Sequence, residues 1–175
     1  MLVLTVIGSD RPGLVELVSR IVAGHGGNWL ESRMSRLGGE FAGIIRVEIA
    51  PSSEPALTRD LAALGSQGLT VVCRSGGVEP PAARRFAALD LVGHDRPGIV
   101  RDISQALARA GANVEELTTS CESAAMSGEP LFKAAIKIGL PEGCDLANIR
   151  RELEEIASNL LVDISLEPVE PGVAG

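Results

Sequence analysis

Two kinds of hydrophobic spacing follow one another at the start of the chain. From Leu2 to Ile7 nearly every position is apolar, which is typical of a strand buried at the centre of a sheet. Beyond the next loop, apolar residues recur at intervals of three and four positions, as on one face of a helix: Leu14, Leu17, Val18, Ile21 and Val22. The pattern therefore predicts a strand that is followed directly by an amphipathic helix.

The remainder of the first half predicts four further elements. Two strands, Trp29–Leu37 and Ala42–Ala50, flank a Gly-Gly pair that is typical of a hairpin turn. A helix is expected over Pro55–Gln67, and a last strand over Leu69–Cys73. The predicted order is strand, helix, strand, strand, helix, strand.

The second half of the chain repeats the first. Residues 93–117 align with residues 8–32 at a shift of 85 positions, and 11 of these 25 positions are identical. A repeat of this length indicates a duplicated domain, because solenoid repeats run to roughly 20–50 residues. We predict a first domain over residues 1–74, a linker over 75–85, a second domain over 86–168 and a tail over 169–175.

The predicted fold class is α+β, with two ferredoxin-like βαββαβ units in tandem. Each unit would form a four-stranded antiparallel sheet with both helices on one face, so the other face must be covered or polar. Apolar strands are expected again near residues 89–92, 114–120, 132–138 and 162–166, and Asp145 is expected to cap the last helix. Since units of this size are only marginally stable alone, we expect association between units or chains.

The sequence Asp-Arg-Pro-Gly joins the first strand to the first helix in both halves. Both copies place the same three residues here: Asp10, Pro12 and Gly13, then Asp95, Pro97 and Gly98. The aspartates are predicted to be helix N-caps, and the prolines to lie in the first helical turn. This structural role accounts for much of the motif without a ligand.

A binding role adds one step to that account. The free amides of a helix N-terminus bind a carboxylate, and a neighbouring aspartate accepts hydrogen bonds from an ammonium group. A free α-amino acid carries both charges at that spacing. Asn28 and Asn113 each follow the aspartate of their copy by 18 residues, at the start of the second strand, where an asparagine is equally a turn residue.

The spacing from Asp-Arg-Pro-Gly to asparagine, within a βαββαβ unit, resembles the ACT domain, over nearly the whole chain as two copies. The resemblance implies a regulatory module that binds a small amino acid between two domains. It also implies the contact residues, which are Asp10, Gly13, Leu14 and Asn28 in the first copy and Asp95, Gly98, Ile99 and Asn113 in the second. Serine-binding members carry asparagine in place of the aspartate, and histidine where this chain has Gly8 and Gly93.

A chain made of two such domains, with the sequence LGGEF after the second strand, resembles the glycine cleavage system transcriptional repressor group. That resemblance implies a regulator that senses glycine and acts through a DNA-binding partner protein, without a helix-turn-helix of its own. It also implies a homo-oligomer and no cofactor.

Composition narrows the function classes. The net charge is −7, Lys and Arg form no run, and only four residues are aromatic, which disfavours direct binding of nucleic acid. No apolar stretch is long enough for a membrane span, and the start does not read as a signal peptide. The three cysteines lack the spacing of metal ligands or a disulfide framework, which favours the cytoplasm.

Catalysis and metal binding are not expected. The two histidines, His25 and His94, do not align between the copies and have no evident partners. Two alternatives to the sensor remain open at this point. One is an interaction scaffold with no working ligand site, and the other is a small hydrolase of the acylphosphatase type, which would pair Arg11 or Arg96 with Asn28 or Asn113.

Overall fold

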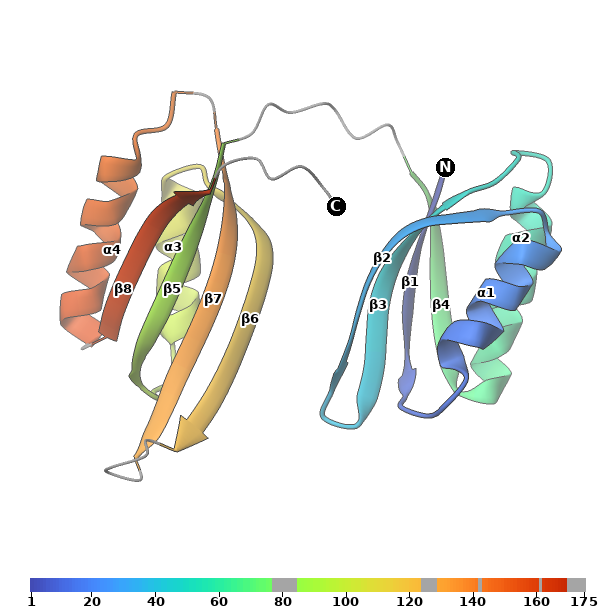
Figure 1. The fold of residues 1–175 in the computed structure, drawn as a ribbon, viewed down its shortest axis with the longest axis horizontal. Coiled ribbons are helices and arrows are strands. Elements are labelled where there is room, and N and C mark those ends of the chain that lie inside the picture. Colours follow the sequence, from blue (N-terminus) through green and yellow to red (C-terminus); the bar gives the residue numbers. More distant parts are fainter. Residues whose placement is uncertain (77–84, 124–128, 142, 161, 170–175) are drawn as a thin grey trace. The chain divides into compact units, whose positions relative to one another are not determined.

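The computed structural model describes residues 1–76, 85–123, 129–141, 143–160 and 162–169. The contacts divide the chain into two compact units, Met1–Pro81 and Ala82–Gly175. Each unit holds a four-stranded antiparallel sheet with its α-helices packed on one face (Figure 1). This arrangement confirms the predicted α+β fold class. Most of the predicted linker over 75–85 and of the predicted tail over 169–175 lies outside the described residues.

The first unit has the predicted order of elements, and its sheet order is β2-β3-β1-β4. The predicted helix over Pro55–Gln67 is wrong in one respect, because it ends as an α-helix at Ala62 and continues as a short 3-10 helix. The elements are β1 (Leu2–Ser9), α1 (Leu14–Gly24), β2 (Asn28–Leu37), β3 (Glu40–Glu48), α2 (Glu54–Ala62), η1 (Ala63–Gln67) and β4 (Leu69–Ser75).

The second unit repeats this arrangement with the sheet order β6-β7-β5-β8. The Asp145 carboxylate accepts a hydrogen bond of 2.9 Å from the backbone N–H of Ala147, which confirms the predicted cap of the last helix. The elements are β5 (Arg85–His94), α3 (Ile99–Arg109), β6 (Asn113–Ser123), β7 (Pro130–Leu140), α4 (Leu146–Leu160) and β8 (Val162–Val169).

Each unit has its own apolar core between the sheet and the helices. One stripe of α1 is buried there, as the sequence predicts, but only alternate residues of β1 are, because the other face of the sheet is open. The second unit uses β5 and α3 in the same way. Among the described residues no polar or charged side chain is fully buried. The core members from these four elements include Leu2, Leu4, Val6, Val18, Val22, Leu89, Leu91, Ile103 and Leu107.

The first helix of each unit ends in the same turn. Gly26 has φ of 72°, and the N–H of Gly27 donates to the carbonyl of Val22 at 2.9 Å, which closes the helix in a Schellman motif. Gly111 also has φ of 72° and ends α3 in the same way. Glycine adopts this positive φ without the steric cost that a Cβ would add.

A bulge interrupts the edge strand that follows each of these turns. The pairing of β2 with β3 shifts register between Trp29 and Glu31, and the pairing of β6 with β7 shifts between Val114 and Glu116. The two bulges are 85 residues apart, so the duplication has kept them. Both lie directly after the asparagines at the strand starts.

Candidate functional site

The loop between the first strand and first helix of each unit differs from the prediction at its aspartate. Gly13, with φ of 94°, is the N-cap of α1, and Gly98, with φ of 99°, is the N-cap of α3. Asp10 and Asp95 are therefore not N-caps. The prolines are not in the first helical turn either. Pro12 comes before Gly13, at which the chain turns into α1, and Pro97 comes before Gly98 and α3 in the same way.

Neither of these two helix N-termini carries a hydrogen bond from a capping side chain in the described structure. A Cβ built at Gly13 would meet no atom within 4 Å, so open space lies beside the first turn of α1. At Gly98 the guanidinium of Arg101 lies 3.1 Å from that position, and Arg101 is paired with Asp102 at 2.8 Å. The first turn is thus more open in the first unit.

Asp10 is engaged by the neighbouring hairpin. Its Oδ2 lies 2.8 Å from Nε of Arg36, near the end of β2, and its backbone N–H donates to the carbonyl of Gly39 at 2.9 Å. The side chains are 34% and 70% exposed, respectively. The carboxylate that would receive a ligand ammonium group in the first unit therefore already has a cationic partner.

Asp95 has a different neighbour. The thiol of Cys121 is hydrogen-bonded to it, and the pKa of that thiol is raised, first by desolvation and then by the Asp95 carboxylate. Cys121 follows Arg36 by 85 residues, so the two occupy the same place in the repeat. No local sequence pattern singles out either residue, although alignment of the copies beyond residue 117 pairs them.

The two asparagines lie far from the loops of their own units. Asn28 pairs with Glu48 at one end of β3, whereas Ser9, next to Asp10, pairs with Glu40 at the other end. Eight residues of strand span about 26 Å. Asn113 is separated from the Asp95 loop in the same way along β7, and its Nδ2 donates to Oε1 of Glu115 at 2.9 Å.

This separation bears on two hypotheses. A ligand that contacts both the loop and the asparagine needs the loop of one unit and the asparagine of another. An acylphosphatase-like pair is not formed within a unit, because Arg11 lies at the loop end and donates to the carbonyl of Gln67 at 3.1 Å. Arg96 occupies the corresponding loop and is equally far from Asn113 along the sheet.

Gly8 and Gly93 are required by close packing. A Cβ built on Gly8 would lie 2.4 Å from the carbonyl oxygen of Gly68, and one on Gly93 would lie 2.2 Å from a methyl group of Val162. Real Cβ atoms do not approach so closely. A histidine is therefore not accommodated at either position in this backbone.

The two histidines have separate local partners. Nε2 of His25, at the end of α1, lies 2.8 Å from Oδ2 of Asp60 in α2, and Nδ1 of His94 lies 3.4 Å from Glu129. The His25 bond lowers the pKa of the Asp60 carboxyl below its ordinary value. His25 thus ties the two helices of the first unit together.

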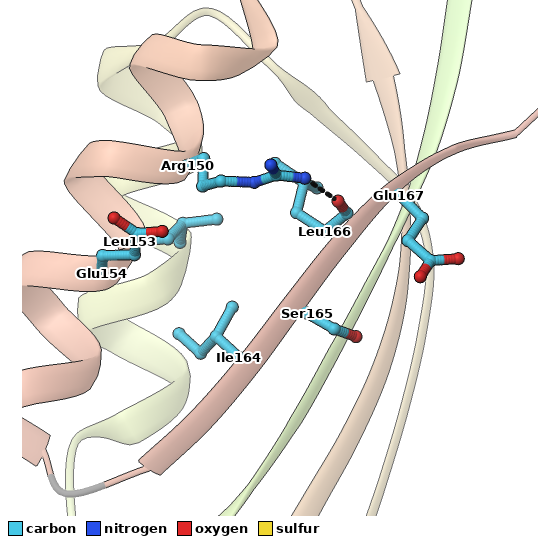
Figure 2. A pocket seen from close by; sticks show the side chains of 7 residues that line it. All are labelled: Arg150, Leu153, Glu154, Ile164, Ser165, Leu166 and Glu167. Atoms are coloured by element: carbon cyan, nitrogen blue, oxygen red, sulfur yellow. Dashed lines mark hydrogen bonds between the residues drawn. The ribbon is translucent and has the colours of Figure 1, made fainter.

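A cavity of about 290 Å³ lies elsewhere in the second unit, between α4 and the edge strand β8. The Arg150 guanidinium donates to the carbonyl of Leu166 at 2.7 Å across it (Figure 2). Pro168, further along β8, has no N–H to offer. Together these features disfavour strand addition at this edge. The cavity contains none of the predicted ligand residues; its lining is Arg150, Leu153, Glu154, Ile164, Ser165, Leu166 and Glu167.

The described part of the chain holds no group of three or more His, Cys, Asp or Glu side chains that could bind a metal ion. Its helices are all too short or too polar to cross a membrane.

Residues 1–74 and 86–167 each match the family model of the ACT domain, so the chain belongs to the ACT domain family. It is 25% identical over 172 residues to the glycine cleavage system transcriptional repressor of Escherichia coli (strain K12), covering 96% of this chain and 90% of that protein. It is thus a tandem ACT protein with regulatory relatives.

Two solved structures are similar to this chain over nearly its whole length. An unknown protein from Galdieria sulphuraria has a TM-score of 0.81 at 31% identity, covering 97% of this chain and 98% of that one. A putative glycine cleavage system transcriptional repressor has a TM-score of 0.73 at 26% identity, covering 97% and 96%. The resemblance stated from the sequence is therefore confirmed at the level of family and group.

Proposed function

We propose that this protein senses a small free amino acid at its strand-to-helix loops and signals by contact with another protein. The observation that carries the proposal is that both units present an uncapped helix N-terminus beside an aspartate. Amides in the first helical turn would hold the ligand carboxylate, and the aspartate would accept from its ammonium group. The proposed contacts are Asp10, Gly13, Leu14 and Asn28, and Asp95, Gly98, Ile99 and Asn113.

The two units are not equivalent in this proposal. Arg36 neutralises Asp10, whereas Asp95 faces the uncharged thiol of Cys121. A ligand ammonium group would have to displace the arginine in the first unit but not in the second. We therefore assign the stronger ammonium contact to the Asp95 loop.

The ligand class follows from the charges that the loops offer and from the relatives. Glycine is the first candidate, because the Escherichia coli relative is named for the glycine cleavage system. That relative is a transcriptional repressor, which favours a DNA-binding regulator of amino-acid metabolism as the protein partner. The net charge of −7 and the four aromatic residues argue against direct contact with nucleic acid.

Completion of the site would need a second unit from the same chain or from another chain. The edge strands β2 and β6 are exposed along most of their length and are suited to pairing with another edge. Exposed valines flank them at matching positions in the helices, Val15 in α1 at 45% and Val100 in α3 at 42%. We propose a homo-oligomer on this basis, without catalysis or a cofactor. All three cysteines are free thiols, which favours the cytoplasm.

Calorimetry and thermal unfolding of the full chain test the sensor against the twenty amino acids. A ligand at about 100 times its Kd stabilises the native state by about 2.7 kcal/mol, which raises Tm by several degrees. We expect glycine or another small amino acid to do so. Acetate or methylamine alone, each offering one charge, should have much smaller effects.

Failure of all twenty amino acids at millimolar concentration would reject the sensor. The scaffold alternative would then stand, and the Asp10–Arg36 ion pair would be its best support. Turnover of acetyl phosphate by the chain would instead revive the hydrolase.

A further inference from the structure

The helix-free face of the first sheet is apolar at its centre. Both α-helices of this unit lie on the opposite face (Figure 1). Ile7 is 47% exposed, Ile44 56% and Val72 49%. Thr5 of β1 lies between Ile44 of β3 and Val72 of β4, and Ile7 is the next side chain of β1 on the same face. The three apolar side chains therefore lie close together across three strands. Contiguous exposed apolar side chains of this kind mark interaction surfaces.

The same face of the second sheet is more polar at its centre. At the positions that correspond in register to Thr5, Ile44 and Val72, it has Asp90, Ala135 and Ser165, while the counterpart of Ile7 is Val92, which is 40% exposed. Around them, Lys133 pairs with Glu122 at 2.7 Å and Lys137 with Glu116 at 3.9 Å. The duplicated fold therefore shows what a solvated open face is composed of, and the first sheet departs from that composition at its centre.

Charges flank the apolar centre: Arg33 of β2 pairs in register with Ile44, and two further charges on β3 are placed to pair with their own copy. Along β3, successive side chains on the open face are Glu40, Ala42, Ile44 and Arg46. Glu40 and Arg46 are thus separated by six residues, about 20 Å, with the two apolar side chains between them. When two such strands face each other in opposite directions, each Glu40 lies opposite the Arg46 of the other copy.

We propose that the open face of the first sheet is an interface between two copies of this chain. Two sheets would pack face to face about 10 Å apart, with Ile7, Ile44 and Val72 of each copy in the centre. A two-fold axis near Gly43 would place both Glu40–Arg46 pairs at the rim. Arg46 already pairs with Glu31 of its own chain at 3.0 Å, so in the dimer the guanidinium would be shared between Glu31 and the Glu40 of the other copy. The interface does not depend on ligand binding.

Sedimentation velocity of the full chain across a range of concentrations tests the proposal. Ile44→Asp places a charge in the centre of the interface, and we expect its dimer dissociation constant to rise about 100-fold or more. Ala135→Asp makes the same change at the matched position of the second sheet and should leave association unchanged. A wild-type chain that stays monomeric, or an Ile44→Asp chain that associates like the wild type, would overturn the proposal.

Two charge reversals test the arrangement without altering the apolar centre. Glu40→Arg alone and Arg46→Glu alone should each weaken self-association, because like charges then meet at both ends of β3. A mixture of the two variants should associate again, since every facing pair is opposite in sign in the mixed dimer. Continued weak association in the mixture would rule out the antiparallel two-fold pairing. Circular dichroism and Tm of each variant establish that it is folded.

Discussion

Nε of Arg36 lies 2.8 Å from Oδ2 of Asp10, and the residue that follows Arg36 by 85 positions is Cys121, which is hydrogen-bonded to Asp95. One substitution within a duplicated framework thus decides whether the loop carboxylate faces a cation or a neutral group. The two copies share their fold but differ in the electrostatics of the loop.

This difference predicts unequal effects of two matched substitutions. Asp95→Ala should weaken binding of the amino acid about 10- to 100-fold, the equivalent of a charge-assisted hydrogen bond of about 1.5–3 kcal/mol. Asp10→Ala should change the affinity little, because Arg36 already occupies that carboxylate. Calorimetric titration of each variant measures the difference, and Cys121→Arg should mimic Asp95→Ala. Equal losses from the two alanine variants would contradict the assignment of the stronger site to the second unit.

The glycines before α1 and α3 predict a stability difference that is independent of any ligand. Gly13 has φ of 94° and open space around its Cα, so Gly13→Ala adds only backbone strain, about 1–2 kcal/mol in the free energy of unfolding. Gly24→Ala, in the same helix and without neighbours within 4 Å of the new methyl group, is the control. It should be neutral or stabilise by up to about 1 kcal/mol. Denaturant titrations measure both, and equal effects would mean that the turn tolerates a side chain.

The bond between His25 and Asp60 predicts a pH-dependent contribution to stability. Because the pKa of Asp60 is lowered in the folded state, the carboxylate binds fewer protons there than in the unfolded chain. Its contribution is therefore fully present above the ordinary value of 3.8 and is lost as the pH falls through the lower folded value. The Tm of Asp60→Asn should lie below that of the wild type near pH 6, and the difference should shrink below about pH 4.

Asp163→Asn, an exposed aspartate on β8, is the matched control for the pH series. Its Tm should follow that of the wild type over the same range. A constant offset between wild type and Asp60→Asn down to pH 2 would show that the substitution acts through packing and not through the charge.

The duplicated fold could be predicted because its signals are local. The apolar run from Leu2 to Ile7 and the helical spacing that starts at Leu14 each require only neighbouring residues to be interpreted. The helix start was predicted wrongly because both aspartate and glycine are favoured N-caps, and only the observed φ of Gly13 decides between them.

The loop chemistry depends on contacts that no local pattern contains. Arg36 reaches Asp10 across a hairpin, so 26 positions separate the partners. Asn28 was placed with the right element, but its separation from Asp10 follows only from the strand register. Likewise, the polarity of each open sheet face became clear only when the register showed which side chains share that face.

The extra residue in β2 and in β6 has a consequence for any redesign of this chain. Side chains of a strand alternate between its two faces, so one inserted residue reverses the phase of everything before it. Asn28 shares a face with Glu48, and Trp29 shares the opposite one with Val47, only because Leu30 is accommodated without a partner. Deleting Leu30 would therefore restore a regular ladder in which Asn28 and Trp29 keep their partners and faces, whereas smoothing out the bulge with Leu30 retained would send the asparagine toward the helices.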